Sequence, residues 1–192
     1  MLITAGFKMA YSMAGGIHAW QGLKATGAPE AGMSFFPENA DPGELIALAW
    51  VLEDGSQKLY SSIANTFTDK EATRFFADLA AAEEHHKAML LGLYRDVTGK
   101  EPQPGFPQGI IVHDEGIMEG GIKVREALAW VRGKDLSQTL EFSMALETDA
   151  YDLYIKMSRR VSDNKAKQIF DLLIKEEIEH LARMATLLDK NL

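Results

Sequence analysis

The fold is decided by residues 77–93, ADLAAAEEHHKAMLLGL, and by their counterpart, residues 171–187, DLLIKEEIEHLARMATL. In both stretches a glutamate is followed three residues later by a histidine, and apolar residues continue the same stripe at steps of three and four. That spacing is typical of one face of an α-helix. Two helices therefore each carry a carboxylate and an imidazole on their apolar face: Glu83 with His86, and Glu177 with His180.

The two stretches belong to a longer internal repeat. A shift of 94 positions aligns residues 41–96 with residues 135–190 without a gap. The repeat matches capping aspartates, apolar residues and polar residues, including the pairs Asp41/Asp135, Glu53/Glu147, Tyr60/Tyr154, Asp69/Asp163 and Phe76/Phe170. Since aspartate is a preferred N-cap residue, each half predicts two helices joined as a hairpin.

Two helical hairpins predict an all-α, four-helix bundle with one long crossover. The expected helices, each capped by one of the four aspartates, cover residues 42–67, 70–94, 136–161 and 164–189. Residues 97–134 contain three prolines and several glycines, so we expect them to form the crossover, with a short helix at residues 122–131.

The inward faces of all four helices carry acidic residues at one level. Glu53 and Glu147 lie on the apolar stripes of the first and third helices, so four carboxylates and two imidazoles point into the bundle. Buried carboxylates are costly and repel one another. Two divalent ions would balance their charge. One glutamate from each of two helices and Glu-x-x-His from each of the others is the di-iron carboxylate pattern, although manganese and zinc suit the same ligands.

Other polar residues near this level have two interpretations. Tyr60 and Tyr154 lie two turns from Glu53 and Glu147, where they can hydrogen-bond a ligand carboxylate or simply fill the core. A second group is expected to be solvated or structural: Glu84, His85, Glu176 and Glu179 on the helix surfaces, and His113 in the crossover.

The composition excludes several classes of site and partner. The 192 residues include no cysteine, which excludes disulfides, thiolate zinc sites and iron–sulfur clusters. The formal charge of −8 argues against a nucleic-acid partner. No apolar run approaches the ~20 residues of a membrane span, and no signal-peptide pattern is seen. These features predict a cytoplasmic protein with no membrane partner.

Residues 41–190 resemble the rubrerythrin branch of the ferritin-like superfamily. The matching motifs are Leu52-Glu53…Tyr60, Glu83-Glu84-x-His86, Leu146-Glu147…Tyr154 and Glu177-x-x-His180. The resemblance implies an up-down-down-up bundle that holds two iron ions. It further implies bridging carboxylates at Glu83 and Glu177, terminal carboxylates at Glu53 and Glu147, and one histidine per iron, His86 and His180.

The same resemblance implies redox chemistry at a non-haem di-iron centre. We expect reduction of hydrogen peroxide or O₂ with electrons from a separate donor protein, because the cysteines of a rubredoxin module are absent. Rubrerythrins also carry a further glutamate three positions after the third-helix ligand, where this chain has Ala150. The alternatives are a non-catalytic iron-binding or storage protein and a ferroxidase-like, iron-oxidising protein.

Residues 2–29 resemble the last strand and helix of a rhodanese domain, through Gly6-Phe7, Gly15-Gly16-x-x-x-Trp20 and Gly27-x-Pro29. The chain lacks the body of such a domain and its catalytic cysteine, so sulfur transfer is not expected. The predicted organisation is a rhodanese-like fragment and linker at residues 1–40, followed by the bundle at residues 41–192. A simple N-terminal arm is the alternative. An apolar strand without its sheet seeks a partner edge, so we expect a homodimer.

Overall fold

The computed structural model describes residues 40–111 and 116–191. Its elements are the helices α2 (Pro42–Ala64), α3 (Lys70–Thr98), α4 (Val124–Val131), α5 (Leu136–Arg160) and α6 (Asn164–Asn191), with a short 3₁₀ helix η2 (Glu119–Gly121) before α4. No β-strand occurs among these residues, which confirms the all-α prediction. The predicted N-terminal strand and helix, and His113, lie outside the described residues, and the domain division at residue 40 stays a prediction.

The helix starts follow the predicted caps. Asp41 accepts a hydrogen bond from the backbone of Glu44, whose side chain accepts one in return from the backbone of Asp41. Asp135 forms the same capping box with Gln138. Asp69 and Asp163 each accept a bond from the backbone three residues later. Each cap satisfies one N–H group that the first turn would otherwise leave free.

Two helix ends differ from the prediction. α2 ends at Ala64 rather than at residue 67. Just after this end, the Thr66 hydroxyl donates a hydrogen bond to the carbonyl of Ile63, which competes with the backbone bonds of a further helical turn. α3 continues to Thr98 rather than residue 94. It ends at Gly99, which takes the left-handed conformation (φ 68°) that glycine adopts without strain.

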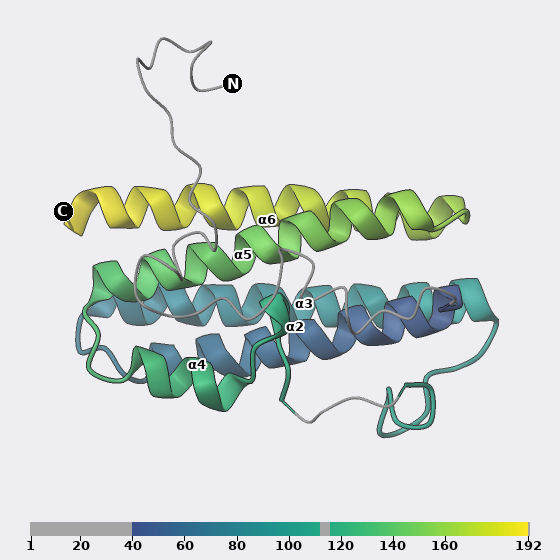
Figure 1. The fold of residues 1–192 in the computed structure, drawn as a ribbon, viewed down its shortest axis with the longest axis horizontal. Coiled ribbons are helices and arrows are strands. Elements are labelled where there is room, and N and C mark those ends of the chain that lie inside the picture. Colours follow the sequence, from purple (N-terminus) through teal and green to yellow (C-terminus); the bar gives the residue numbers. More distant parts are fainter. Residues whose placement is uncertain (1–39, 112–115, 192) are drawn as a thin grey trace, which may run out of the picture.

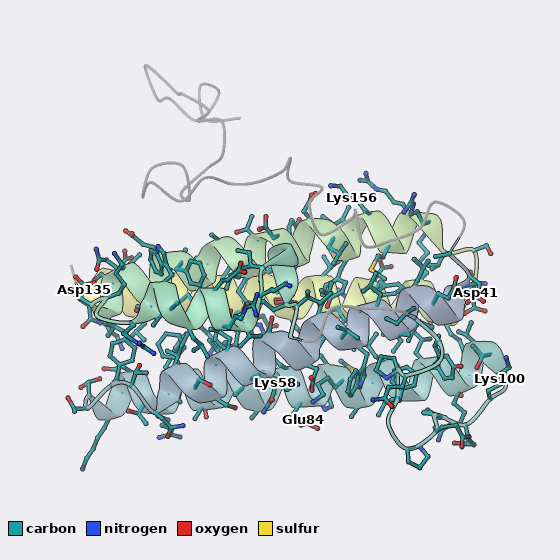
Figure 2. The ribbon with its side chains drawn as sticks, turned by 60° about the horizontal axis from the view of Figure 1, so that its bottom comes forward. Asp41, Lys58, Glu84, Lys100, Asp135 and Lys156 are labelled. Carbon is teal, nitrogen blue, oxygen red and sulfur yellow. The ribbon has the colours of Figure 1, made fainter. Side chains whose placement is uncertain are left out.

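The helices form two antiparallel hairpins, α2 with α3 and α5 with α6 (Figure 1). The crossover runs back along the bundle, so α3 and α5 point in the same direction and the order is up-down-down-up (Figure 1). Asp41 and Asp135, the caps of α2 and α5, accordingly lie at opposite ends of the molecule (Figure 2). None of the described helices combines the length and apolar character needed to cross a membrane.

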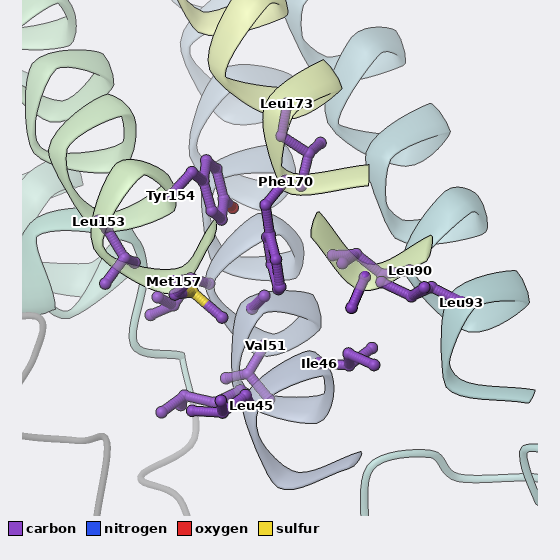
Figure 3. Packing of buried hydrophobic residues seen from close by; sticks show 14 of the residues in the cluster. Leu45, Ile46, Val51, Leu90, Leu93, Leu153, Tyr154, Met157, Phe170 and Leu173 are labelled. Carbon is purple, nitrogen blue, oxygen red and sulfur yellow. The ribbon is translucent and has the colours of Figure 1, made fainter. Parts of the chain in front are cut away.

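The core consists of two apolar clusters with a polar level between them. One cluster uses the first half of α2, the end of α3, the end of α5 and the start of α6, and includes Ile46, Leu90 and Phe170 (Figure 3). The other uses the opposite ends of the same helices and includes Phe76 and Leu140. The predicted metal ligands fall between these clusters along every helix, so apolar packing seals their level from both sides.

The crossover packs closely against the middle of α2. A Cβ atom on Gly55 would lie 2.2 Å from the carbonyl oxygen of Ile117 and 2.7 Å from the Cβ of Met118. Any side chain at position 55 would therefore push the crossover away. Gly120, with φ 71°, supplies the turn that follows Glu119. The predicted short helix is present as α4, close to residues 122–131.

Candidate metal centre

All six predicted ligand residues meet at the polar level between the two clusters. Each of the four long helices contributes, and the exposed fraction of the residue is 0% for each of the four glutamates and His86, and 4% for His180. Two overlapping groups have ligand atoms within 4.8 Å of one another: Glu53, Glu83, His86 and Glu177, and Glu83, Glu147 and His180. Glu83 belongs to both groups, which is the arrangement needed for two adjacent ions.

Glu83 and Glu177 each direct one oxygen toward each histidine. Glu83 Oε2 lies 2.9 Å from His86 Nδ1, and Glu83 Oε1 lies 3.8 Å from His180 Nδ1. Glu177 mirrors this, with Oε2 3.4 Å from His180 Nδ1 and Oε1 3.9 Å from His86 Nδ1. A carboxylate that spans two imidazole nitrogens in this way has the placement of a ligand that bridges two ions.

Glu53 and Glu147 occupy the outer positions. Glu53 Oε2 lies 3.1 Å from His86 Nδ1, and Glu147 Oε2 lies at the same distance of 3.1 Å from His180 Nδ1. The two imidazole rings face one another with centroids 5.6 Å apart. Each half of the site therefore has one outer carboxylate and one imidazole nitrogen turned inward.

The two tyrosines cross between the hairpins. Tyr154 donates a hydrogen bond to Glu53 Oε1, and Tyr60 donates one to Glu147 Oε1. Burial and the neighbouring carboxylates raise the pKa of both phenols well above the usual value, so both remain donors. Of the two interpretations of these tyrosines, the structure supports hydrogen bonding to the ligand carboxylates.

Without an ion, the site shares its protons unevenly. Burial raises the pKa of Glu83, and the charge of Glu53 raises it further. Burial and the charge of Glu147 likewise raise the pKa of Glu177. Burial alone would lower the pKa of His86, but the charge of Glu53 and hydrogen bonds raise it to about 12. These shifts favour the neutral form of Glu83 and Glu177 and the charged form of His86.

The outer carboxylates behave in the opposite way. Burial would raise the pKa of Glu147, but the neighbouring His180 and the hydrogen bond from Tyr60 lower it to about 2. Burial also acts to raise the pKa of Glu53, and the charge of His86 with its hydrogen bonds lowers it below the usual value. The lowered pKa values favour the ionised form of Glu53 and Glu147, which is the form that binds a cation.

Glu83 and Glu177 leave four buried oxygen atoms without a hydrogen bond. Neither oxygen of Glu83 and neither oxygen of Glu177 takes part in a hydrogen bond of acceptable geometry, although both residues are fully buried. Buried polar groups are otherwise almost always partnered. Four inward-facing oxygens between two imidazole nitrogens match the donor set of a pair of ions such as iron, manganese or zinc. The residues present therefore fit a di-metal group.

No protein-family model and no curated protein matches the sequence. Among solved structures, a hypothetical protein from Pyrococcus furiosus superposes with a TM-score of 0.60 at 20% identity, covering 85% of this chain and 95% of its own. A protein from Thermotoga maritima, named as a candidate ferritin-like diiron-carboxylate protein, superposes with a TM-score of 0.58 at 18% identity. That match covers 78% of this chain and 95% of the other. The fold is ferritin-like.

The ferritin-like bundle corrects the prediction for Glu176. That residue was expected to be a solvated surface charge, but its side chain is only 30% exposed and its Oε2 lies 2.5 Å from His86 Nε2. It sits one residue before Glu177, and the close approach of α3 and α6 turns it onto the outer nitrogen of His86. Glu84, His85 and Glu179 are exposed as expected.

Glu119 is a site residue that the sequence analysis did not single out. It belongs to η2 in the crossover, yet its exposed fraction is 0%. Its Oε2 accepts a hydrogen bond of 2.8 Å from the Ser56 hydroxyl, and its Oε1 lies 3.5 Å from the Tyr154 hydroxyl. Burial and the charges of Glu53 and Glu147 raise its pKa well above the usual value. The one available signal was an acidic residue between apolar Ile117-Met118 and two glycines.

Proposed function

We propose that this ferritin-like protein is a di-iron carboxylate oxidoreductase of the rubrerythrin type, which reduces hydrogen peroxide or O₂. The observation that carries the proposal is the set of four fully buried oxygens of Glu83 and Glu177, which take part in no hydrogen bond and face the inner nitrogens of His86 and His180. A structural role offers no reason to bury these oxygens without a hydrogen bond, because leaving them unsatisfied costs free energy.

Iron suits this site chemically. An iron pair supplies two electrons to a bound oxidant, which is the stoichiometry needed to reduce hydrogen peroxide to water. The chain's own residues prepare the place for that chemistry. Tyr60 and Tyr154 fix the outer oxygens of the terminal glutamates, so their inner oxygens stay turned toward the histidines. The two apolar clusters keep bulk water away from the site, which strengthens its electrostatic interactions.

The electrons are proposed to come from a separate donor protein. The chain contains no cysteine that could hold an iron–sulfur or rubredoxin-type relay. Since the ligands lie within the bundle rather than on its surface, the donor would act across the helices that cover them. A cytoplasmic location and a homodimer remain predictions from the sequence.

Two measurements test the proposal. Elemental analysis of protein purified without added metal is expected to find two iron ions per chain. Anaerobic titration of the reduced protein with hydrogen peroxide is expected to consume about one equivalent of peroxide per iron pair. The loss of the reduced-iron signal in the Mössbauer spectrum monitors this reaction.

A matched pair of variants separates the site from its surroundings. Glu83→Ala removes a bridging carboxylate, whereas Glu84→Ala removes the adjacent exposed one, whose side chain is 63% exposed. Only the first is expected to lose metal and peroxide reduction. Tight binding of two ions without peroxide or O₂ consumption would overturn the oxidoreductase and favour an iron-binding or storage role. Two ions still bound in Glu83→Ala would overturn the site itself.

A further inference from the structure

The 94-residue repeat gives the two halves of the site the same proposed ligands but different supporting residues around them. The proposed ligands correspond one to one, Glu53 with Glu147, Glu83 with Glu177 and His86 with His180. A site built only from them would surround both ions equally. Two supporting residues, Glu176 and Glu119, break this equality at independent places.

The first difference lies behind the histidines. His86 presents Nδ1 to the site and its Nε2 lies 2.5 Å from Glu176 Oε2. The repeat places Ala82 where a matching carboxylate for His180 would have to be. A carboxylate on the outer nitrogen fixes the orientation of an imidazole and makes its inner nitrogen a stronger donor to a metal. The described residues give this support to His86 alone.

The second difference lies behind the outer carboxylates. Glu119 bonds to Ser56, one turn after Glu53, and contacts Tyr154, which itself donates to Glu53. The repeat places Ala150 at the position that corresponds to Ser56, so the Glu147 side has no equivalent hydroxyl. The crossover therefore delivers its buried carboxylate to the Glu53 side of the site.

Both differences favour the same position. We propose that the two metal positions are inequivalent, and that the position between Glu53 and His86 binds its ion first and more tightly than the position between Glu147 and His180. This proposal rests on the proposed di-metal function and adds an order of filling to it. Glu176 and Glu119 act as positioning residues, through His86 and through Tyr154 with Glu53 respectively.

Substoichiometric loading with Mn²⁺ tests the proposal directly. The metal-free full chain, given one equivalent of Mn²⁺, is expected to show the six-line EPR spectrum of isolated ions. A crystal grown at the same loading is expected to show anomalous density beside Glu53 and His86. The second equivalent should then produce the spectrum of a coupled pair, with an affinity at least about tenfold weaker than that of the first.

Variants separate the order of filling from general charge effects. Glu176→Ala is expected to lower the affinity for the first ion by roughly tenfold and to leave the affinity for the second unchanged. Glu179→Ala removes the same charge from an exposed position of the same helix and is expected to change neither ion. Ala82→Glu offers His180 the support it lacks and is expected to narrow the gap between the two affinities. Circular dichroism and thermal melting establish that each variant is folded.

The outcomes distinguish this proposal from the one on which it rests. Equal affinities, or first density beside Glu147 and His180, would overturn the order of filling while leaving a di-metal site. An equal effect of Glu176→Ala and Glu179→Ala would overturn the role of Glu176. No specific Mn²⁺, Fe²⁺ or Zn²⁺ binding to the folded wild-type protein would overturn the di-metal function itself.

Discussion

The hydroxyl of Tyr154 on α5 donates a hydrogen bond to the carboxylate of Glu53 on α2. The reverse bond runs from Tyr60 on α2 to Glu147 on α5. Each hairpin therefore holds the outer carboxylate of the other, and the candidate metal site and the packing of the two hairpins depend on the same contacts.

Removing the Tyr154 hydroxyl is expected to weaken metal binding. In Tyr154→Phe, Glu53 Oε1 loses its donor, and residues that orient metal ligands typically contribute about 10–100-fold to affinity. Competition titration with a chelator of known affinity measures the loss. Tyr151→Phe, three residues earlier on α5, provides the control and should bind metal like the wild type. Equal affinities of the two variants would contradict the orienting role.

Replacing Glu177 by leucine is expected to have opposite effects on binding and on stability. The variant loses a bridging carboxylate and should bind neither ion. Without metal it should unfold with a free energy about 1–3 kcal/mol higher than the wild type, because two unsatisfied buried oxygens are removed. Urea denaturation of the metal-free proteins measures the difference.

The control for this change is Glu179→Leu, at an exposed position of the same helix. It should retain both ions and change the free energy of unfolding by less than about 0.5 kcal/mol. A metal-free Glu177→Leu that is less stable than the wild type would show that Glu177 contributes to folding rather than to a site.

Metal affinity is expected to rise with pH. With no ion bound, the pKa of His86 is raised to about 12, and the pKa values of Glu83 and Glu177 are raised above the usual range. The raised pKa values favour the protonated forms of these groups, and a metal must displace their protons. Each proton released adds about a factor of ten in affinity per pH unit.

Calorimetry in buffers of different ionisation enthalpy counts those protons, and dissociation constants measured at several pH values give the slope. Glu84→Ala, which leaves the buried groups in place, should show the same slope as the wild type. An affinity independent of pH would contradict the proton distribution described above.

Adding one methyl group at position 55 is expected to destabilise the protein. The new Cβ would lie 2.2 Å from the Ile117 carbonyl oxygen, so the crossover must move or α2 must bend. Overpacking of this kind costs about 1–3 kcal/mol. Gly92→Ala, in α3, meets no atom within 4 Å and should instead stabilise by about 0.5–1 kcal/mol through helix propensity. The free energies of unfolding of the two variants should therefore change in opposite directions.

The sequence was sufficient to predict the helices and to predict that the six proposed ligand side chains meet at one level. Capping aspartates and the apolar stripe mark where each helix begins and which face turns inward, and the repeat shows that the stripes of both hairpins carry glutamate at the same level. These signals are local, since residues three and four apart share a helix face wherever the helix packs.

The supporting residues Glu176 and Glu119 could not be predicted in this way, because their positions depend on contacts between segments. Glu176 lies one step off the inward stripe and resembles any solvated glutamate until α3 brings His86 against it. Glu119 lies in a loop, whose course is determined by packing against Gly55 rather than by any period of its own. The inward face of each helix was predictable, whereas the contacts of the crossover loop were not.

The division of the site between two hairpins has a consequence for its symmetry. Each hairpin supplies two glutamates, one histidine and one tyrosine, so two identical hairpins from separate chains would together contain the same set. Such an assembly would have a two-fold axis through its centre, and its ions would be interchangeable. Glu119 belongs to neither hairpin, and a single copy cannot lie on both sides of that axis. Because the crossover that joins the hairpins reaches inward, the two sides of the candidate metal site differ, and ions bound there would not be interchangeable.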